Sequence, residues 1–109
     1  MNYNIITLPF FSRQLKRLVK KYPSLRAEYA SLIARLEKEP EQGTPLGGDC
    51  FKIRLAITSK GKGKSGGARV ITLVVHAAQT VYLLSIYDKS EQADITDKAL
   101  EALVKAATE

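Results

Sequence analysis

Apolar residues change their spacing about halfway along the chain. Two sets in the first half recur at helical intervals: Phe11, Leu15, Leu18 and Val19, then Leu25, Tyr29, Leu32, Ile33 and Leu36. Tyr22-Pro23 separates the sets, because proline disrupts a helix interior, and Ser24 is placed to cap the second helix. We therefore predict two antiparallel helices joined by a tight turn, after a short β-branched strand over residues 3–8.

The second half has strand periodicity. Residues 51–57 alternate, with apolar side chains on one face and Lys52 and Arg54 on the other. Residues 69–75 and 80–87 are near-continuous apolar runs, which indicate inner strands, and residues 76–79 join them as a hairpin. Apolar spacing then predicts a C-terminal helix, with Thr96 or Asp94 as its cap. Residues 39–49 are expected to be loop.

These elements predict an α+β fold in the order β-α-α-β-β-β-α. A small, mostly antiparallel sheet would carry the N-terminal helical hairpin packed on it and the C-terminal helix. The 109 residues suit a single domain, 1–109. No apolar run approaches the roughly 20 residues that span a bilayer, and the first eight residues lack a signal-peptide pattern. We expect a cytoplasmic protein without a membrane segment.

Positive charge is concentrated in one segment. Between residues 50 and 87 there are six basic residues and no Asp or Glu: Lys52, Arg54, Lys60, Lys62, Lys64 and Arg69. Elsewhere the basic residues equal the 11 acidic residues in number, so the net charge of +6 belongs to this segment. Such a concentration is typical of proteins that bind polyanions, above all nucleic acid. The alternative is a solvated, solubilising surface.

A cluster of Lys and Arg could also cleave RNA. Cleavage needs a deprotonated 2′-hydroxyl, neutralisation of the charge on the pentavalent phosphate, and a proton for the leaving 5′-oxygen. Converging cations lower a lysine pKa toward a useful base, and Arg binds phosphate in bidentate fashion. His76 is excluded as the base because its strand puts it roughly 23 Å from Arg69. Cys50 has no nearby His and cannot form an internal disulfide, and we expect no metal site or cofactor.

Three segments carry a family resemblance: FKIRLA (51–56), SKGKGKSGGARVI (59–71) and VYLLSIYDKSEQADI (81–95). In order and spacing they resemble the RelE/ParE superfamily of toxins, in particular the HigB-like branch of the RelE mRNA endoribonucleases. The resemblance implies the toxin of a type II toxin-antitoxin system, a ribosome-dependent, metal-independent mRNA interferase that inhibits translation. Its implied partners are a cognate antitoxin, the ribosome and mRNA.

The resemblance also implies roles for individual residues. Lys52 and Arg54 would hold the phosphate, with one of them serving as base, and Arg69 would stabilise the transition state. Lys60, Lys62 and Lys64 resemble the basic loop of the HigB-like branch and would bind RNA backbone, which the intervening glycines allow to approach closely.

Tyr87 and Lys89 are the remaining candidates for the site. Tyr87 would stack on a base or donate a proton, although packing in the sheet explains it equally well. Lys89 would approach from the end of the same strand. The family's further cations and tyrosine are replaced here by Glu91 and Ile95, which leaves the general acid open.

Two other functions stay open on the same fold. One is a ParE-like inhibitor of DNA gyrase, which the cations at 52, 54 and 69 disfavour, and the other is an inactive RNA-binding member. The antitoxin could cover the cationic site or displace the C-terminal helix. The sequence does not choose between these routes, and it does not fix the codon preference or the oligomeric state.

Overall fold

The computed structural model describes residues 2–61 and 66–109. Within these residues a five-stranded sheet with the order β1-β5-β4-β3-β2 is combined with three α-helices. The elements follow the chain in this order: β1 (Asn4–Thr7), α1 (Pro9–Lys21), α2 (Leu25–Lys38), β2 (Thr44–Gly47), β3 (Cys50–Leu55), β4 (Ala68–Val75), β5 (Thr80–Asp88) and α3 (Asp97–Thr108). The predicted α+β fold is confirmed, with one strand added to it.

The two near-continuous apolar runs form the middle of the sheet. β5 pairs with β1 on one side and β4 on the other, and β4 also pairs with β3. Only the β1–β5 pair is parallel among the described strands. Both middle strands are buried along almost their whole length, as the sequence predicted for strands covered on two faces.

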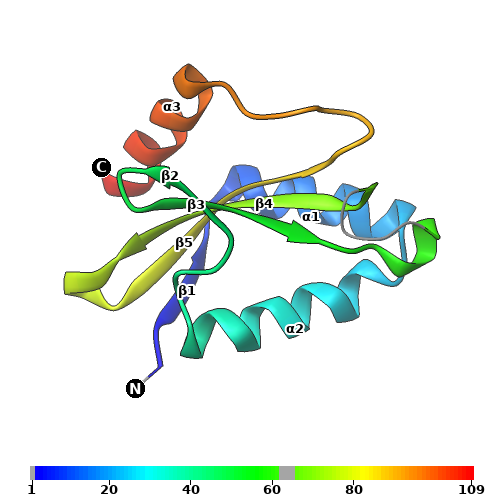
Figure 1. The fold of residues 1–109 in the computed structure, drawn as a ribbon, viewed down its shortest axis with the longest axis horizontal. Helices are drawn as coiled ribbons and strands as arrows, with labels where there is room; N and C mark the ends of the chain where they lie inside the picture. Colours follow the sequence, from blue (N-terminus) through cyan, green and yellow to red (C-terminus); the bar gives the residue numbers. More distant parts are fainter. Residues whose placement is uncertain (1, 62–65) are drawn as a thin grey trace.

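The helices cover the sheet through the apolar stripes that predicted them. Phe11 and Leu18 of α1 and Leu25, Leu32 and Leu36 of α2 are fully buried in the core. In Figure 1 the sheet lies between α2 and α3, and a wide loop leads from β5 to α3. Within the described residues, each helix is too short or too polar to span a membrane.

The helix ends test the predicted caps. Pro9 occupies the first position of α1. The helix stops before Tyr22-Pro23, where the sequence predicted its end. Thr96 caps α3 by accepting a hydrogen bond from the Ala99 N–H at 3.1 Å. Ser24 stands at the N-cap of α2 but makes no capping bond, so this prediction was wrong. Its helical backbone angles (φ −65°, ψ −20°) turn the hydroxyl elsewhere.

β2 lies inside the segment expected to be loop. Thr44–Gly47 pairs antiparallel with the first residues of β3, with an irregularity between Pro45 and Gly47. β2 is at the edge of the sheet, where proline is tolerated because only one side of the strand forms ladder hydrogen bonds. The strand is too short and too rich in turn residues to show an alternating pattern. β2 pairs only as far as Lys52, so the rest of β3 has no strand on this side among the described residues.

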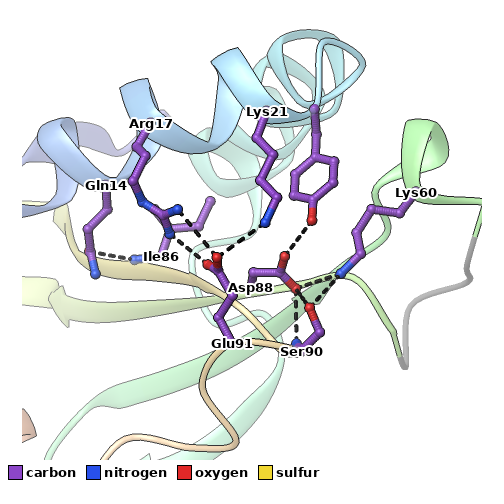
Figure 2. A network of polar contacts seen from close by, with 9 residues as sticks. Gln14, Arg17, Lys21, Lys60, Ile86, Asp88, Ser90 and Glu91 are labelled. Atoms are coloured by element: carbon purple, nitrogen blue, oxygen red, sulfur yellow. Dashed lines mark hydrogen bonds and ion pairs between the residues drawn. The ribbon is translucent and has the colours of Figure 1, made fainter.

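A side chain of α1 continues the sheet where β1 stops. β1 pairs with β5 only up to Leu83. Beyond that point the Ile86 N–H and the Ser85 hydroxyl both donate to Gln14 Oε1, at 3.0 and 3.1 Å; Figure 2 shows the bond to Ile86. This contact holds the last residues of β5, which lead into Tyr87 and Asp88, against α1.

Candidate active site

Three predicted site residues form a row across the sheet. Arg54 of β3 lies directly opposite Arg69 of β4, and Arg69 lies directly opposite Tyr87 of β5. The side chains of directly opposed residues share one face of a sheet, and their Cβ atoms lie about 4.5–5.5 Å apart. Lys52, two residues before Arg54, projects from the same face. The fold therefore brings together four of the five residues for which the sequence suggested catalytic roles.

Burial differs strongly along this row. Arg69 is 5% exposed and Tyr87 4%, whereas Arg54 is exposed and Lys52 is intermediate. The Arg69 guanidinium donates to the Ala68 carbonyl at 3.1 Å. Because an arginine keeps its charge when buried, Arg69 places a permanent positive charge in a poorly solvated position. A phosphate that reached this charge would interact with it more strongly than in water.

The carboxylate of Asp94, for which the sequence predicts only a possible role as a helix cap, lies among the cations. Oδ1 accepts a hydrogen bond from the Lys52 ammonium at 3.1 Å and from the Ile95 N–H at 2.8 Å, and the Tyr87 hydroxyl lies 3.5 Å away. The Ile95 N–H and then Lys52 lower the pKa of Asp94, so it is ionised at neutral pH. An anion from the chain itself thus occupies part of the cationic face.

The pKa of Tyr87 moves in the opposite direction. Burial raises it first, the negative charge of Asp94 raises it further, and Arg69 offsets part of the increase. The phenol therefore stays protonated at neutral pH. It is equipped to donate a proton or a hydrogen bond, rather than to accept a proton.

Lys89 is turned toward the β5–α3 loop. Its ammonium donates to the Ala93 carbonyl at 2.7 Å, and its positive charge contributes to lowering the pKa of Asp94. The backbone N–H of Lys89 bonds to the Gly67 carbonyl. Lys89 thus lies at the margin of the row and shapes the loop that carries Asp94.

Lys60 belongs to a separate, buried network at the end of β5 (Figure 2). Asp88 is fully buried and accepts hydrogen bonds from the Lys60 ammonium (2.6 Å), the Tyr22 hydroxyl (2.8 Å), and the N–H and hydroxyl of Ser90 (2.9 and 2.8 Å). Burial alone raises the pKa of Asp88, but these donors outweigh it and hold the pKa well below its usual range.

The network gives Lys60 a structural role, whereas the sequence predicted that it binds RNA backbone. The Lys60 side chain is 7% exposed, and its ammonium also lies 5.3 Å from the centre of the Tyr22 ring. In this conformation the ammonium donates to Asp88 and Ser90, and little of the side chain is accessible to an RNA backbone within the part of the chain that the structure describes. Lys60 therefore anchors the start of the loop to α1 and β5. Lys62 and Lys64, the other two predicted RNA contacts, lie outside the described residues.

Neither His76 nor Cys50 joins the site. His76 begins the turn after β4, at the opposite end of that strand from Arg69, and its ring nitrogens contact the Tyr3 hydroxyl at 2.9 Å and Glu41 at 3.0 Å. Cys50 is buried, and burial raises the pKa of its thiol. In the described part of the chain, no three His, Cys, Asp or Glu residues group as metal ligands would.

Known proteins share this fold. The double arginine-to-alanine mutant of Escherichia coli toxin RelE in the free state is 22% identical, with a TM-score of 0.63 over 97% of this chain and 98% of that chain. The intact E. coli RelBE toxin-antitoxin complex contains a chain that is 18% identical (TM-score 0.61; 79% of this chain, 95% of that one). The RelBE2 toxin-antitoxin complex of Mycobacterium tuberculosis contains one that is 21% identical (TM-score 0.58; 86% and 95%).

A family model agrees with these similarities. The model described as RelE toxin of the RelE / RelB toxin-antitoxin system matches residues 10–109, nearly the whole chain. The resemblance inferred from the three sequence segments is thereby confirmed at the level of the family, while the HigB-like branch stays a prediction. Two of the similar structures are complexes with an antitoxin, in agreement with the predicted partner. The chain belongs to the RelE family of toxins of type II toxin-antitoxin systems.

Proposed function

We propose that this toxin is a ribosome-dependent endoribonuclease that cuts mRNA in the cytoplasm without a metal ion. The observation that supports this most strongly is the row of Arg54, Arg69 and Tyr87 beside Lys52 on one face of the sheet. It combines an exposed arginine and a half-buried lysine, both of which can contact RNA, with a buried arginine and a protonated phenol.

The proposed reaction divides the work among these side chains. Arg54 holds the phosphate, and binding of the RNA separates Lys52 from Asp94. Lys52 gives its own proton to solvent and then accepts the proton of the 2′-hydroxyl as the O2′–P bond forms, and Arg69 neutralises the additional negative charge. Tyr87 donates its proton to O5′ as the P–O5′ bond breaks. The products are a 2′,3′-cyclic phosphate and a 5′-hydroxyl.

Cleavage during in-vitro translation tests the proposal. Primer extension would map mRNA ends after addition of the wild-type protein, Arg54→Ala or Arg69→Ala, with ribosome-free mRNA as a control. We expect cuts only on ribosomes, with losses of about a hundredfold or more for Arg69→Ala because it removes a charge that stabilises the transition state. Arg54 is exposed, so its variant keeps the fold and serves as the check if Arg69→Ala is unstable. Intact mRNA with normal translation would refute the proposal and direct attention to gyrase supercoiling.

A further inference from the structure

A cleft of about 780 Å³ adjoins the cationic face, where α2 passes the free edge of β3. Lys52 and Arg54 line it from β3, and Ser31 and Arg35 line it from α2. Its volume lies within the range of about 300–1,000 Å³ that is usual for ligand sites. Because Lys52 and Arg54 belong to both places, the cleft continues the candidate active site toward α2.

The cleft has an excess of positive charge. Arg35 and Arg54 are exposed, and neither forms an ion pair with another residue that the structure describes. Among the described residues that line the cleft, Glu28 is the one carboxylate, and it already forms hydrogen bonds within the chain. It accepts hydrogen bonds from the Thr58 N–H and hydroxyl at 2.7 and 2.6 Å and from the Ser24 hydroxyl at 3.1 Å. Glu28 therefore fixes the turn after β3 and leaves both arginines available to an anion.

We propose that this cleft binds the single-stranded RNA next to the scissile phosphate, with Arg35 on a backbone phosphate one or more nucleotides away. The inference rests on the proposed function, because it extends the same RNA-binding face. Ser31, Gln42 and Thr44 add hydroxyl and amide groups along the cleft, and its lining in residues 2–61 and 66–109 contains no aromatic ring. Contacts of this kind read the RNA backbone rather than the identity of a base.

Counterion release gives the expected size of the effect. For single strands, log Kobs changes with log[salt] by about −0.7 per phosphate contact, so loss of one contact reduces the slope by about 0.7. At about 0.1 M salt this corresponds to about fivefold weaker binding. The loss requires an RNA long enough to reach from the active site into the cleft.

Binding of non-cleavable RNA tests the inference without relying on catalysis. Fluorescence anisotropy would follow 2′-O-methyl oligonucleotides in a length series from the dinucleotide upward, at several salt concentrations. Arg35→Ala is compared with Arg26→Ala, which removes the same charge from the same helix. Arg26 is the matched control because it lines a different groove, on the side of α1. We expect Arg35→Ala alone to lose the affinity gained by the longer oligonucleotides, and Arg35→Lys to retain the salt slope.

Two outcomes would overturn the inference. In one, Arg35→Ala and Arg26→Ala bind every oligonucleotide equally well. In the other, Arg35→Ala leaves RNA binding intact but weakens the complex with the antitoxin, which would assign the cleft to that protein. The proposed function can fail separately. If the wild-type protein cuts no mRNA but Arg35→Ala still weakens RNA binding, the RNA-binding role of the cleft stands and the nuclease function is refuted.

Discussion

Replacement of Asp94 by Asn should strengthen RNA binding, the opposite of what is expected from removing a cation of the site. Asp94 lies 3.1 Å from the Lys52 ammonium, and the two side chains are 63% and 27% exposed. Pairs with this much solvent contact contribute about 0.2–1 kcal/mol. Since 1.4 kcal/mol is tenfold in affinity, an RNA phosphate freed from competition with this carboxylate should bind about one and a half to five times more tightly.

The assay is anisotropy with a non-cleavable oligonucleotide, and Asp97→Asn is the matched control. Asp97 is exposed in the first turn of α3 and forms no ion pair with Lys52 in the described structure, so its replacement makes the same change in net charge without breaking the Lys52–Asp94 pair. Because the pKa of Asp94 is lowered, the difference should persist at neutral pH and disappear only as acid protonates the carboxylate. Added salt should reduce this difference in RNA affinity, because it screens the charges. Weaker binding by Asp94→Asn, or the same change in Asp97→Asn, would refute the competition between Asp94 and phosphate.

Two further predictions concern stability, measured by urea denaturation. Asp88→Asn should lower the free energy of unfolding by about 3–5 kcal/mol at neutral pH, because Lys60 is left buried without its partner. Glu91→Gln breaks exposed ion pairs with two α1 cations and should lower it by less than about 1 kcal/mol. The pKa of Asp88 is lower in the folded than in the unfolded chain, so its contribution is complete above the unfolded value of about 3.9 and is lost as pH falls toward the folded value. Asp88→Asn should therefore flatten the acid loss of stability, and an unchanged pH profile would contradict this reasoning. Gly43→Ala should destabilise more than Gly48→Ala. Both glycines have positive φ, but of the two only Gly43 would place a Cβ against backbone, at the Lys52 carbonyl oxygen. Equal losses of stability would contradict this reasoning.

The sequence predicted the parts of this protein that depend on periodicity. The helical spacing of α1 and α2 and the apolar runs of β4 and β5 correspond to buried faces, because burial is what creates such patterns. The alternation in β3 also placed Lys52 and Arg54 on one face. β2 was not predicted, since four residues with a proline and a glycine show no period.

The site was predictable only in part, for a physical reason. Its members on strands could be inferred, because register follows from the hairpin between β4 and β5. Asp94 and Lys60 could not be assigned this way, because both lie outside the strands. Asp94 contacts Lys52, which is 42 positions away in sequence, and Lys60 contacts Asp88, which is 28 positions away. An acidic residue on the connection that leaves β5 was the only available signal for Asp94.

The central claim is that this cationic face activates the 2′-hydroxyl of mRNA. The most direct measurement uses ribosomes programmed with an mRNA that carries a single 2′-deoxynucleotide on the 5′ side of the mapped cut. We predict that the toxin leaves this mRNA intact at that position, while the all-ribose mRNA is cut to a 2′,3′-cyclic phosphate. Equal cleavage of the two mRNAs would show that another nucleophile attacks the phosphate and would contradict the claim that Lys52 activates the 2′-hydroxyl.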